Sequence, residues 1–411
     1  MTRAAQGIQR IYLTLTLCNT LAASFIWGIN TLFLLDAGLT NTEAFGANAF
    51  FTVGQVLFEV PTGIVADTLG RKISFVLGAF TLMATTLLYF WLWQISAPFW
   101  MWAVTSALLG LGFTFFSGAT EAWLVDALHA TGFKGNLESP FAKGQIVGGV
   151  AMLTGSVAGG VIAQTTNLGV PYIIRSVILA LTFVVALVFM KDIGFTPQRG
   201  GRVFSRMKNI FSASITHGLK NRPVRWIMLA APFSFGVSFY AFYAMQPYLL
   251  ELYGNERAYG VAGLAAAIIA GAQIAGGFAV RFVRRYFTNR TSVLLTAVIL
   301  NTIILVGIGL TSNFWVAIIL LVMWGLIFSA SGPVQQAYLN GLIPSQQRAT
   351  VLSFASLMGS SGGVVIQPAL GKVADAWSYS ISYIVGGGFQ LLAAPFIALA
   401  RREKPKSDPI K

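Results

Sequence analysis

The chain has 411 residues, of which 56% are hydrophobic and only 10% are charged, and its formal net charge is +14. Soluble proteins are about a quarter charged, so this composition excludes a water-exposed globular protein. The mean hydropathy of +0.72 indicates lipid as the solvent, where every backbone polar group needs an internal partner and only helices or closed barrels can span.

Apolar runs recur along the whole chain at roughly the ~20 residues that a helix needs to cross the hydrocarbon core. Barrel strands would be about half as long and would alternate. We therefore predict an all-α membrane protein with twelve transmembrane helices, at residues 11–35, 43–66, 73–93, 97–127, 141–165, 171–191, 224–250, 258–285, 290–310, 313–341, 348–371 and 379–400. The first run has the length of a full span and lacks a small-residue cleavage site, so we interpret it as a retained helix.

A short polar hairpin, GIVADTLGRK at residues 63–72, joins the second and third spans. A helix that ends in an acid, a glycine turn and a basic pair, and is followed at once by another apolar run, places this hairpin at a membrane surface. The stretch resembles the loop signature Gly-x-x-x-Asp-x-x-Gly-Arg-Lys of the major facilitator superfamily. That resemblance implies the family's fold, two pseudo-symmetric six-helix bundles.

The resemblance also implies a conformational role for the hairpin. In family members the loop arginine often pairs with an acid at the end of the fourth span, where this chain has Asp126. We expect a latch that holds the two halves in one state, formed by Asp67, Gly70, Arg71, Lys72 and Asp126. The alternative is a set of surface ion pairs, which would contribute little.

The basic segment 192–223 divides the chain into six spans at 1–191 and six at 224–411. Apolar residues between Met207 and Leu219 recur at helical spacing, which favours a short helix lying in the cytoplasmic interface over a disordered linker. The halves are weakly similar, because GSVAGG at 155–160 is echoed by GSSGG at 359–363. Repeated halves are typical of secondary transporters, whose substrate site lies between them near the midplane.

The hairpin also has a decayed copy after the eighth span. This copy is GGFAVRFVRR at residues 276–285, where Val280 takes the place of Asp67. Only the first copy therefore keeps its acid, and we expect an asymmetric latch.

Basic residues gather on one side of the predicted topology. If the N-terminus is inside, every Lys and Arg except Arg175, Arg257 and Lys372 falls in an inside segment. The positive-inside rule then places both termini in the cytoplasm of a multi-pass protein of the cell membrane, as in a bacterial inner membrane. We interpret the net positive charge as a determinant of membrane orientation that also attracts anionic lipid headgroups, rather than as a sign of nucleic-acid binding.

Residues for enzymatic chemistry are scarce. There is no G-x-x-x-x-G-K-[ST] phosphate loop, and His129, His217 and Cys18 form no metal-ligand spacing. We expect no enzyme, no cofactor and no metal, so uphill transport would draw on an ion gradient. Glu59 and Glu121 are the proton-coupling candidates, because an intramembrane carboxylate is costly unless it is paired or protonated.

Alternatives stay open for the charged residues of the spans. Glu59 could be a structural acid bonded to a neighbouring helix or to Arg71. Glu121 could join the charge cluster of the latch. Arg175, near the outer end of the sixth span, is expected to snorkel to the headgroups or to pair with Asp36.

In the family's fold, spans one, four, seven and ten line the cavity. Their aromatic and amide residues suit a lipophilic or weakly polar solute, while helix packing is the alternative role. These cavity candidates are Asn19, Trp27, Asn30, Phe115, Phe116, Tyr240, Tyr243, Gln246, Trp324, Gln335 and Gln336. The helix-packing glycines Gly155, Gly159 and Gly160 resemble the G-P-x-x-G-G motif of drug–proton antiporters, with Ser156 replacing the proline.

The sequence therefore predicts a monomeric, proton-coupled exporter of small amphipathic compounds that works by alternating access. The alternative is an uptake carrier or uniporter for one metabolite. A receptor or scaffold would show no flux, and the chain has no sizeable soluble domain to support that role.

Overall fold

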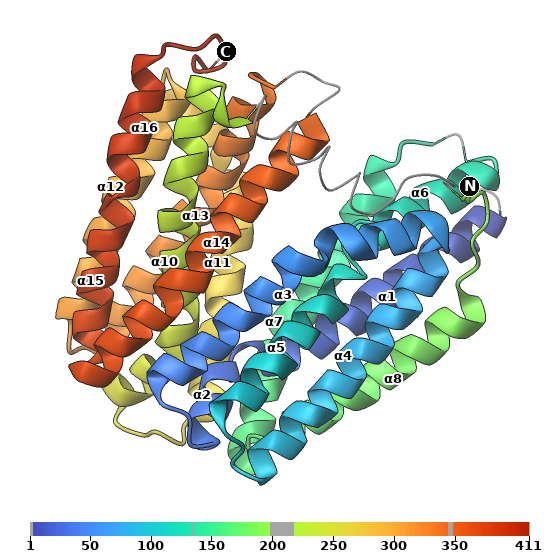
Figure 1. Ribbon diagram of the computed structural model, residues 1–411, viewed down its shortest axis with the longest axis horizontal. Helices are drawn as coiled ribbons and strands as arrows, with labels where there is room; N and C mark the ends of the chain where they lie inside the picture. Colours follow the sequence, from blue (N-terminus) through green and yellow to red (C-terminus); the bar gives the residue numbers. More distant parts are fainter. Residues whose placement is uncertain (1–2, 134, 198–217, 344–347, 411) are drawn as a thin grey trace. The chain divides into compact units, whose positions relative to one another are not determined.

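The computed structural model describes residues 3–133, 135–197, 218–343 and 348–410. Within these ranges the regular structure is helical, and the β pairing is one isolated bridge between Asn289 and Pro409. Figure 1 shows the helices, which are α1 Arg3–Trp27, α2 Asn30–Asp36, α3 Asn41–Thr68, α4 Arg71–Gln94, α5 Phe99–Thr114, α6 Ala119–Ala130, α7 Glu138–Thr165, α8 Val170–Phe189, α10 Arg222–Tyr253, α11 Tyr259–Tyr286, α12 Arg290–Leu310, α13 Phe314–Asn340, α14 Arg348–Ala376, α15 Tyr379–Leu391 and α16 Ala393–Arg402.

In the part of the chain that the structure describes, 11 helices are long and apolar enough to cross a membrane, and the bent pair α1–α2 makes up to 12. The predicted all-α fold is confirmed, but the first span is not straight. It bends by 49° after Trp27, where Gly28 lies against α11. A Cβ at Gly28 would be 3.0 Å from the Gly263 Cα, so the bend coincides with a close helix contact.

Two other spans are interrupted in ways that the sequence analysis did not anticipate. The fourth span consists of α5 and α6, separated by residues 115–118, and Gly118 in this gap has a φ of +67°. The last span consists of α15 and α16, with Leu392 between them. The gap between α5 and α6 is important for the candidate site, because it lies beside Glu59.

The described residues pack into two compact units. Unit 1 comprises Met1–Gly38, Phe50–Val203 and Arg257–Ala267, and unit 2 comprises Leu39–Ala49, Phe204–Glu256 and Ile268–Lys411. The start of α3 therefore groups with helices of the second half of the chain, and the start of α11 with helices of the first half. The predicted division at residues 192–223 stays a prediction.

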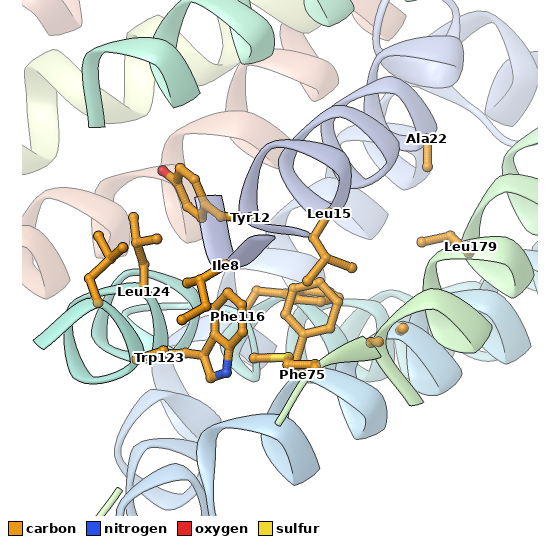
Figure 2. Packing of buried hydrophobic residues seen from close by; sticks show 14 of the residues in the cluster. Ile8, Tyr12, Leu15, Ala22, Phe75, Phe116, Trp123, Leu124 and Leu179 are labelled. Atoms are coloured by element: carbon orange, nitrogen blue, oxygen red, sulfur yellow. The ribbon is translucent and has the colours of Figure 1, made fainter. Parts of the chain in front are cut away.

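Unit 1 is built around α1, which packs along α7 and α8, while α4 packs along α5 and α8. Figure 2 shows its core, where Tyr12 and Leu15 of α1 meet Phe75 of α4, Trp123 of α6 and Leu179 of α8. Lipid tails are as apolar as these side chains, so close packing rather than exclusion of water holds such helices together.

Unit 2 repeats this plan with other helices. Helix α10 packs along α14 and α16, and α12 packs along α13 and α15. Its core includes Met228 of α10, Leu294 of α12, Tyr338 of α13 and Ile397 of α16.

Helix α8 illustrates how the spans fit a lipid environment. Val177, Leu181 and Val188 are 63%, 54% and 56% exposed, whereas Arg175 and Thr182 are buried. The apolar face points outward and the polar residues point into the protein, which is the reverse of a helix on the surface of a soluble protein.

Candidate functional site

The polar hairpin between α3 and α4 turns at Gly70, whose φ of +120° is a conformation that residues with side chains rarely adopt. Across the turn, Arg71 Nη1 lies 2.7 Å from Asp67 Oδ1. Both side chains keep partial exposure, so the ion pair contributes about 0–1 kcal/mol to stability. The structure therefore pairs the acid and the arginine of the motif, and their role as a latch stays a prediction.

A further carboxylate, which the sequence did not reveal, contacts the same hairpin from another part of the chain. Asp192, after the end of α8, accepts a hydrogen bond from the Lys72 backbone N–H at 2.9 Å. This N–H is among those that a helix start leaves without an intrahelical partner. A Cβ at Gly70 would lie 2.3 Å from Asp192 Oδ2. Both the backbone conformation and the lack of space therefore disfavour a larger residue at this turn.

The segment around Asp192 makes two more contacts. The Arg71 Cζ lies 5.9 Å from the centroid of the Phe195 ring, and the Trp123 indole N–H donates to the Lys191 carbonyl at 2.8 Å. The start of the predicted linker is therefore attached both to the hairpin and to α6. The only sequence signal for this attachment was an acid directly after the last apolar run of the first half.

Asp126, the remaining member of the predicted latch, is half-buried on α6. Among the described residues, the ion pair of Arg71 is with Asp67, and none joins Arg71 to Asp126. The Asp126 carbonyl instead approaches the linker, because a Cβ at Gly194 would lie 2.8 Å from it. Asp192 is thus the second acid on the hairpin, and the latch function stays a prediction.

Glu59, on α3, lies beside the interruption between α5 and α6. Ser117 in this gap donates its hydroxyl to Glu59 Oε1 at 2.6 Å. The Phe115 carbonyl in the same gap accepts a hydrogen bond from the Ser74 hydroxyl at 2.8 Å. The gap is therefore bonded to α3 through Ser117 and to α4 through the Phe115 carbonyl.

Helix α3 is itself irregular at the level of Glu59. Pro61 lacks the N–H that would bond the Leu57 carbonyl, and the Thr62 hydroxyl donates to the Phe58 carbonyl at 2.8 Å. Glu59 is half-buried rather than enclosed, and its carboxylate has a polar contact with the Ser117 hydroxyl.

Glu121, the second coupling candidate, lies in the first turn of α6. Its side chain is exposed and interacts electrostatically with Tyr12 of α1. Glu59 therefore contacts the gap in the fourth span through its hydrogen bond with Ser117. Glu121 follows the same gap in the chain, in the first turn of α6.

The cavity candidates of unit 1 lie in different environments. Asn19, Trp27 and Phe115 are half-buried. Asn30, at the start of α2, accepts a hydrogen bond from the Tyr172 hydroxyl at 3.0 Å. Phe116 is 7% exposed and belongs to the core, and its cavity role stays a prediction.

The cavity candidates of unit 2 divide in the same way. Tyr240, Gln246 and Trp324 are enclosed, with exposed fractions of 1%, 0% and 2%, because they face neighbouring helices. Tyr243 and Gln335 are half-buried, and Gln336 is exposed. Gln335 lines a cavity of about 160 Å³ between α10, α12, α13, α15 and α16.

The glycine motif lies where helices approach most closely. Cβ atoms at Gly155 and Gly159 would each be 1.9 Å from an oxygen atom of α1, and one at Gly160 would be 2.6 Å from a carbonyl of α11. In unit 2, a Cβ at Gly362 of α14 would be 1.8 Å from a carbonyl of α10. Small residues allow such contacts between membrane helices. The two glycine sequences therefore have the same packing role in the fifth and in the eleventh span.

Arg175 corrects an expectation from the sequence. It does not snorkel, because it is 3% exposed and its Nε donates to the Thr86 hydroxyl at 3.1 Å. Asp36, the acid suggested as its partner, accepts a hydrogen bond from the Trp93 indole at 2.8 Å. The reason is the orientation of α8, whose polar face turns toward α4.

A second carboxylate contact, within unit 2, was invisible in the sequence. Asp375, near the end of α14, accepts hydrogen bonds from the backbone N–H groups of Asn41 and Thr42 at 2.9 and 2.8 Å, and a third from the Thr42 hydroxyl. The Glu43 N–H bonds the Thr40 hydroxyl at 3.3 Å. The first N–H groups of α3 are thus satisfied partly by its own capping box and partly by a residue of the second half. We call the contact between Asp375 and residues 41–42 the clasp.

Two sequence predictions concern parts that the structure does not describe. The proposed interfacial helix between Met207 and Leu219 falls mainly within residues 198–217, outside the described residues. In the decayed second hairpin, the side chains of residues 279–285, including Val280, are also not described.

Comparison with known families gives one match that covers most of the chain. A model described as Major Facilitator Superfamily matches residues 12–365 and 274–411. No curated protein matches the chain.

Solved structures of transporters share the fold at low sequence identity. A mutant of the nucleoside transporter NupG is 12% identical, with a TM-score of 0.77 over 95% of this chain and 99% of that chain. A bacterial homolog of the human lysosomal transporter Spinster, inward-facing and unoccupied, is 15% identical, with a TM-score of 0.74 over 99% of each chain. The transporter PepTSo of the POT family is 13% identical, with a TM-score of 0.75 over 98% and 99%.

Proposed function

Because the chain belongs to the major facilitator superfamily, and is therefore a multi-pass membrane protein with a transporter fold, we propose that it is a proton-coupled exporter of small amphipathic compounds. It works by alternating access, as a monomer in the cell membrane with both termini in the cytoplasm. The observation that carries the proposal is the hydrogen bond between Ser117 and Glu59 at the gap in the fourth span.

The coupling step follows from the chemistry of this pair. An ionised Glu59 can accept a hydrogen bond from the Ser117 hydroxyl, and the structure has a bond between these two groups at 2.6 Å. A charged carboxylate is costly at membrane depth, and protonation of Glu59 removes that charge. The protonated carboxyl gains an O–H group that must itself find an acceptor. Protonation therefore changes the hydrogen bonding of the gap between α5 and α6, and an interrupted helix is a suitable element to respond to an ion.

Two polar contacts would have to open and close during the cycle. One is the hairpin latch of Asp67, Gly70, Arg71 and Lys72, with Asp126 on the adjacent α6 and with Asp192 added from the structure. The other is the clasp of Asp375 on the start of α3. Each is a set of exposed or half-buried hydrogen bonds worth a few kcal/mol at most, which suits contacts that are broken in every turnover.

The proposed solute class rests on the half-buried cavity candidates. Trp27, Phe115 and Tyr243 offer aromatic surface, and Asn19 and Gln335 offer amides. In each unit taken by itself, such residues favour compounds with an apolar body and a few hydrogen-bonding groups.

The test is transport into proteoliposomes with an imposed pH gradient, with ethidium as the probe of amphipathic solutes. We expect movement that depends on the gradient, and loss of that dependence in Glu59→Gln. Glu138→Gln is the matched control, since Glu138 is an exposed acid at the start of α7 that bonds Asn136. Movement that ignores the gradient and survives Glu59→Gln and Glu121→Gln together would refute proton coupling.

A second candidate is an uptake carrier or uniporter for one hydrogen-bonding metabolite. The buried amides around the cavity of unit 2 favour it, because they would match a polar solute better than a lipophilic one. Radiolabelled uridine serves as the probe, since one structural relative is a nucleoside transporter. Saturable uridine accumulation without ethidium movement would favour this candidate over export.

A further inference from the structure

The cavity of about 160 Å³ in unit 2 lies among α10, α12, α13, α15 and α16. Its wall is largely apolar, with Phe235 and Phe328 meeting edge-on at a centroid distance of 5.8 Å. Trp324 stacks behind Phe328 at 5.9 Å. One side of the cavity is therefore a rigid aromatic wall, continued by aliphatic side chains of α10 and α12.

Polar groups converge on the same space. Asn301 of α12 and Gln390 of α15 both line the cavity and are each 4% exposed. The Gln390 amide N–H donates to the Ser234 hydroxyl at 3.4 Å, which is a long bond. The Asn301 Oδ1 is buried and has no hydrogen-bond partner in the described structure.

An unpaired buried amide oxygen is unfavourable, by about 1–3 kcal/mol, so a donor has to reach it in the working protein. The lining residues include no charged side chain, which disfavours an ionic ligand because its charge would be desolvated without compensation. The size is close to the ~150 Å³ of an engineered cavity that binds a single benzene ring.

We propose that this cavity binds a small neutral molecule with one aromatic ring and one hydrogen-bond donor, such as a phenol. The ring lies against Phe235 and Phe328, and the donor bonds the Asn301 Oδ1. This site lies within the helices of the second half, so it does not rest on proton coupling or on the direction of transport.

The experiment is ligand-observed fluorine NMR on the full chain in nanodiscs. The probes are para-fluorophenol, para-fluorotoluene, which lacks the donor, and para-fluorobenzoate, which is charged. We expect saturable binding of the phenol, weaker binding of the toluene by about fivefold for one neutral hydrogen bond, and no saturable binding of the benzoate. Empty nanodiscs correct for partition into lipid.

Three variants assign the binding to the cavity. Asn301→Ala should reduce the affinity for the phenol to about that for the toluene, because it removes the amide that carries the acceptor. Ala297→Leu, at a lining position, should abolish binding of both probes by filling the space. Ala337→Leu is the control, since Ala337 is exposed on α13 and should bind the phenol as the wild type does.

Several outcomes would overturn the proposal. These are an absence of saturable phenol binding, equal affinities for phenol and toluene, or phenol binding that survives both Asn301→Ala and Ala297→Leu. The Glu59→Gln variant separates this proposal from the transport proposal. It should bind the phenol normally while failing to couple, so loss of transport coupling alone would leave the cavity site intact.

Discussion

Removal of the Asp375 carboxylate should loosen the start of α3. Asp375→Ala deletes the acceptor for the N–H groups of Asn41 and Thr42 and for the Thr42 hydroxyl. Loss of a helix N-cap acceptor costs about 1 kcal/mol, and loss of a negative charge at a helix N-terminus costs about 0.3–1 kcal/mol more. Because Asp375 is exposed, water replaces part of the loss, and we expect a total of about 1.5 kcal/mol.

The assay is hydrogen–deuterium exchange, followed by mass spectrometry, on the protein in nanodiscs. A cost of about 1.5 kcal/mol corresponds to roughly tenfold faster exchange in peptides that cover Thr40 to Ala44. Asp375→Asn, which keeps one neutral acceptor, should give an intermediate increase. Asp192→Ala is a reciprocal control, because it should leave these peptides unchanged and expose the Lys72 amide instead.

The reasoning would be refuted if Asp375→Ala exchanged at the wild-type rate over Thr40 to Ala44. The capping box of Thr40 and Glu43 would then suffice for the start of α3, and the clasp would have no energetic role.

Other substitutions test the remaining contacts. Gly70→Ala should lower stability to thermal unfolding by about 1–3 kcal/mol, because its φ is +120° and its Cβ would lie 2.3 Å from Asp192; an unchanged melting temperature would contradict the hairpin geometry. Gly159→Ala should also lower the melting temperature, since its Cβ would lie 1.9 Å from a carbonyl of α1, whereas Gly7→Ala on α1 has open space and should be neutral or stabilising by about 0.5–1 kcal/mol. Trp123→Phe removes the hydrogen bond to the Lys191 carbonyl and should speed tryptic cleavage after Lys191 by about fivefold; cleavage at the wild-type rate would show that this bond does not hold the start of the linker.

The spans could be predicted well because their signal is local. A run of about 20 apolar residues in lipid forms a transmembrane helix. Each predicted run corresponds to a helix or to a bent or interrupted pair of helices. The interruptions were harder, since Gly118 is a weak signal alone and the stabilising Ser74 hydroxyl comes from another helix. The bend after Trp27 likewise depends on where α11 packs.

The sequence placed the hairpin residues together because they form one contiguous motif. Asp67 and Arg71 are four residues apart, and the structure pairs them across the turn. Asp192 and Asp375 bond groups that are 120 and 334 residues away in sequence, so no local pattern could reveal them. Asn301 was missed for the same reason, because a single amide in an apolar run gains meaning only from the four other helices around it.

The central claim, that proton movement is coupled to solute export through Glu59, is tested most directly by measuring both fluxes at once. Proteoliposomes that contain a pH-sensitive dye are given ethidium without an imposed pH gradient. We predict that solute movement changes the internal pH in proportion, and that Glu59→Gln abolishes this pH change while Glu138→Gln preserves it. Solute movement with no change in internal pH, or an undiminished pH change in Glu59→Gln, would contradict the account.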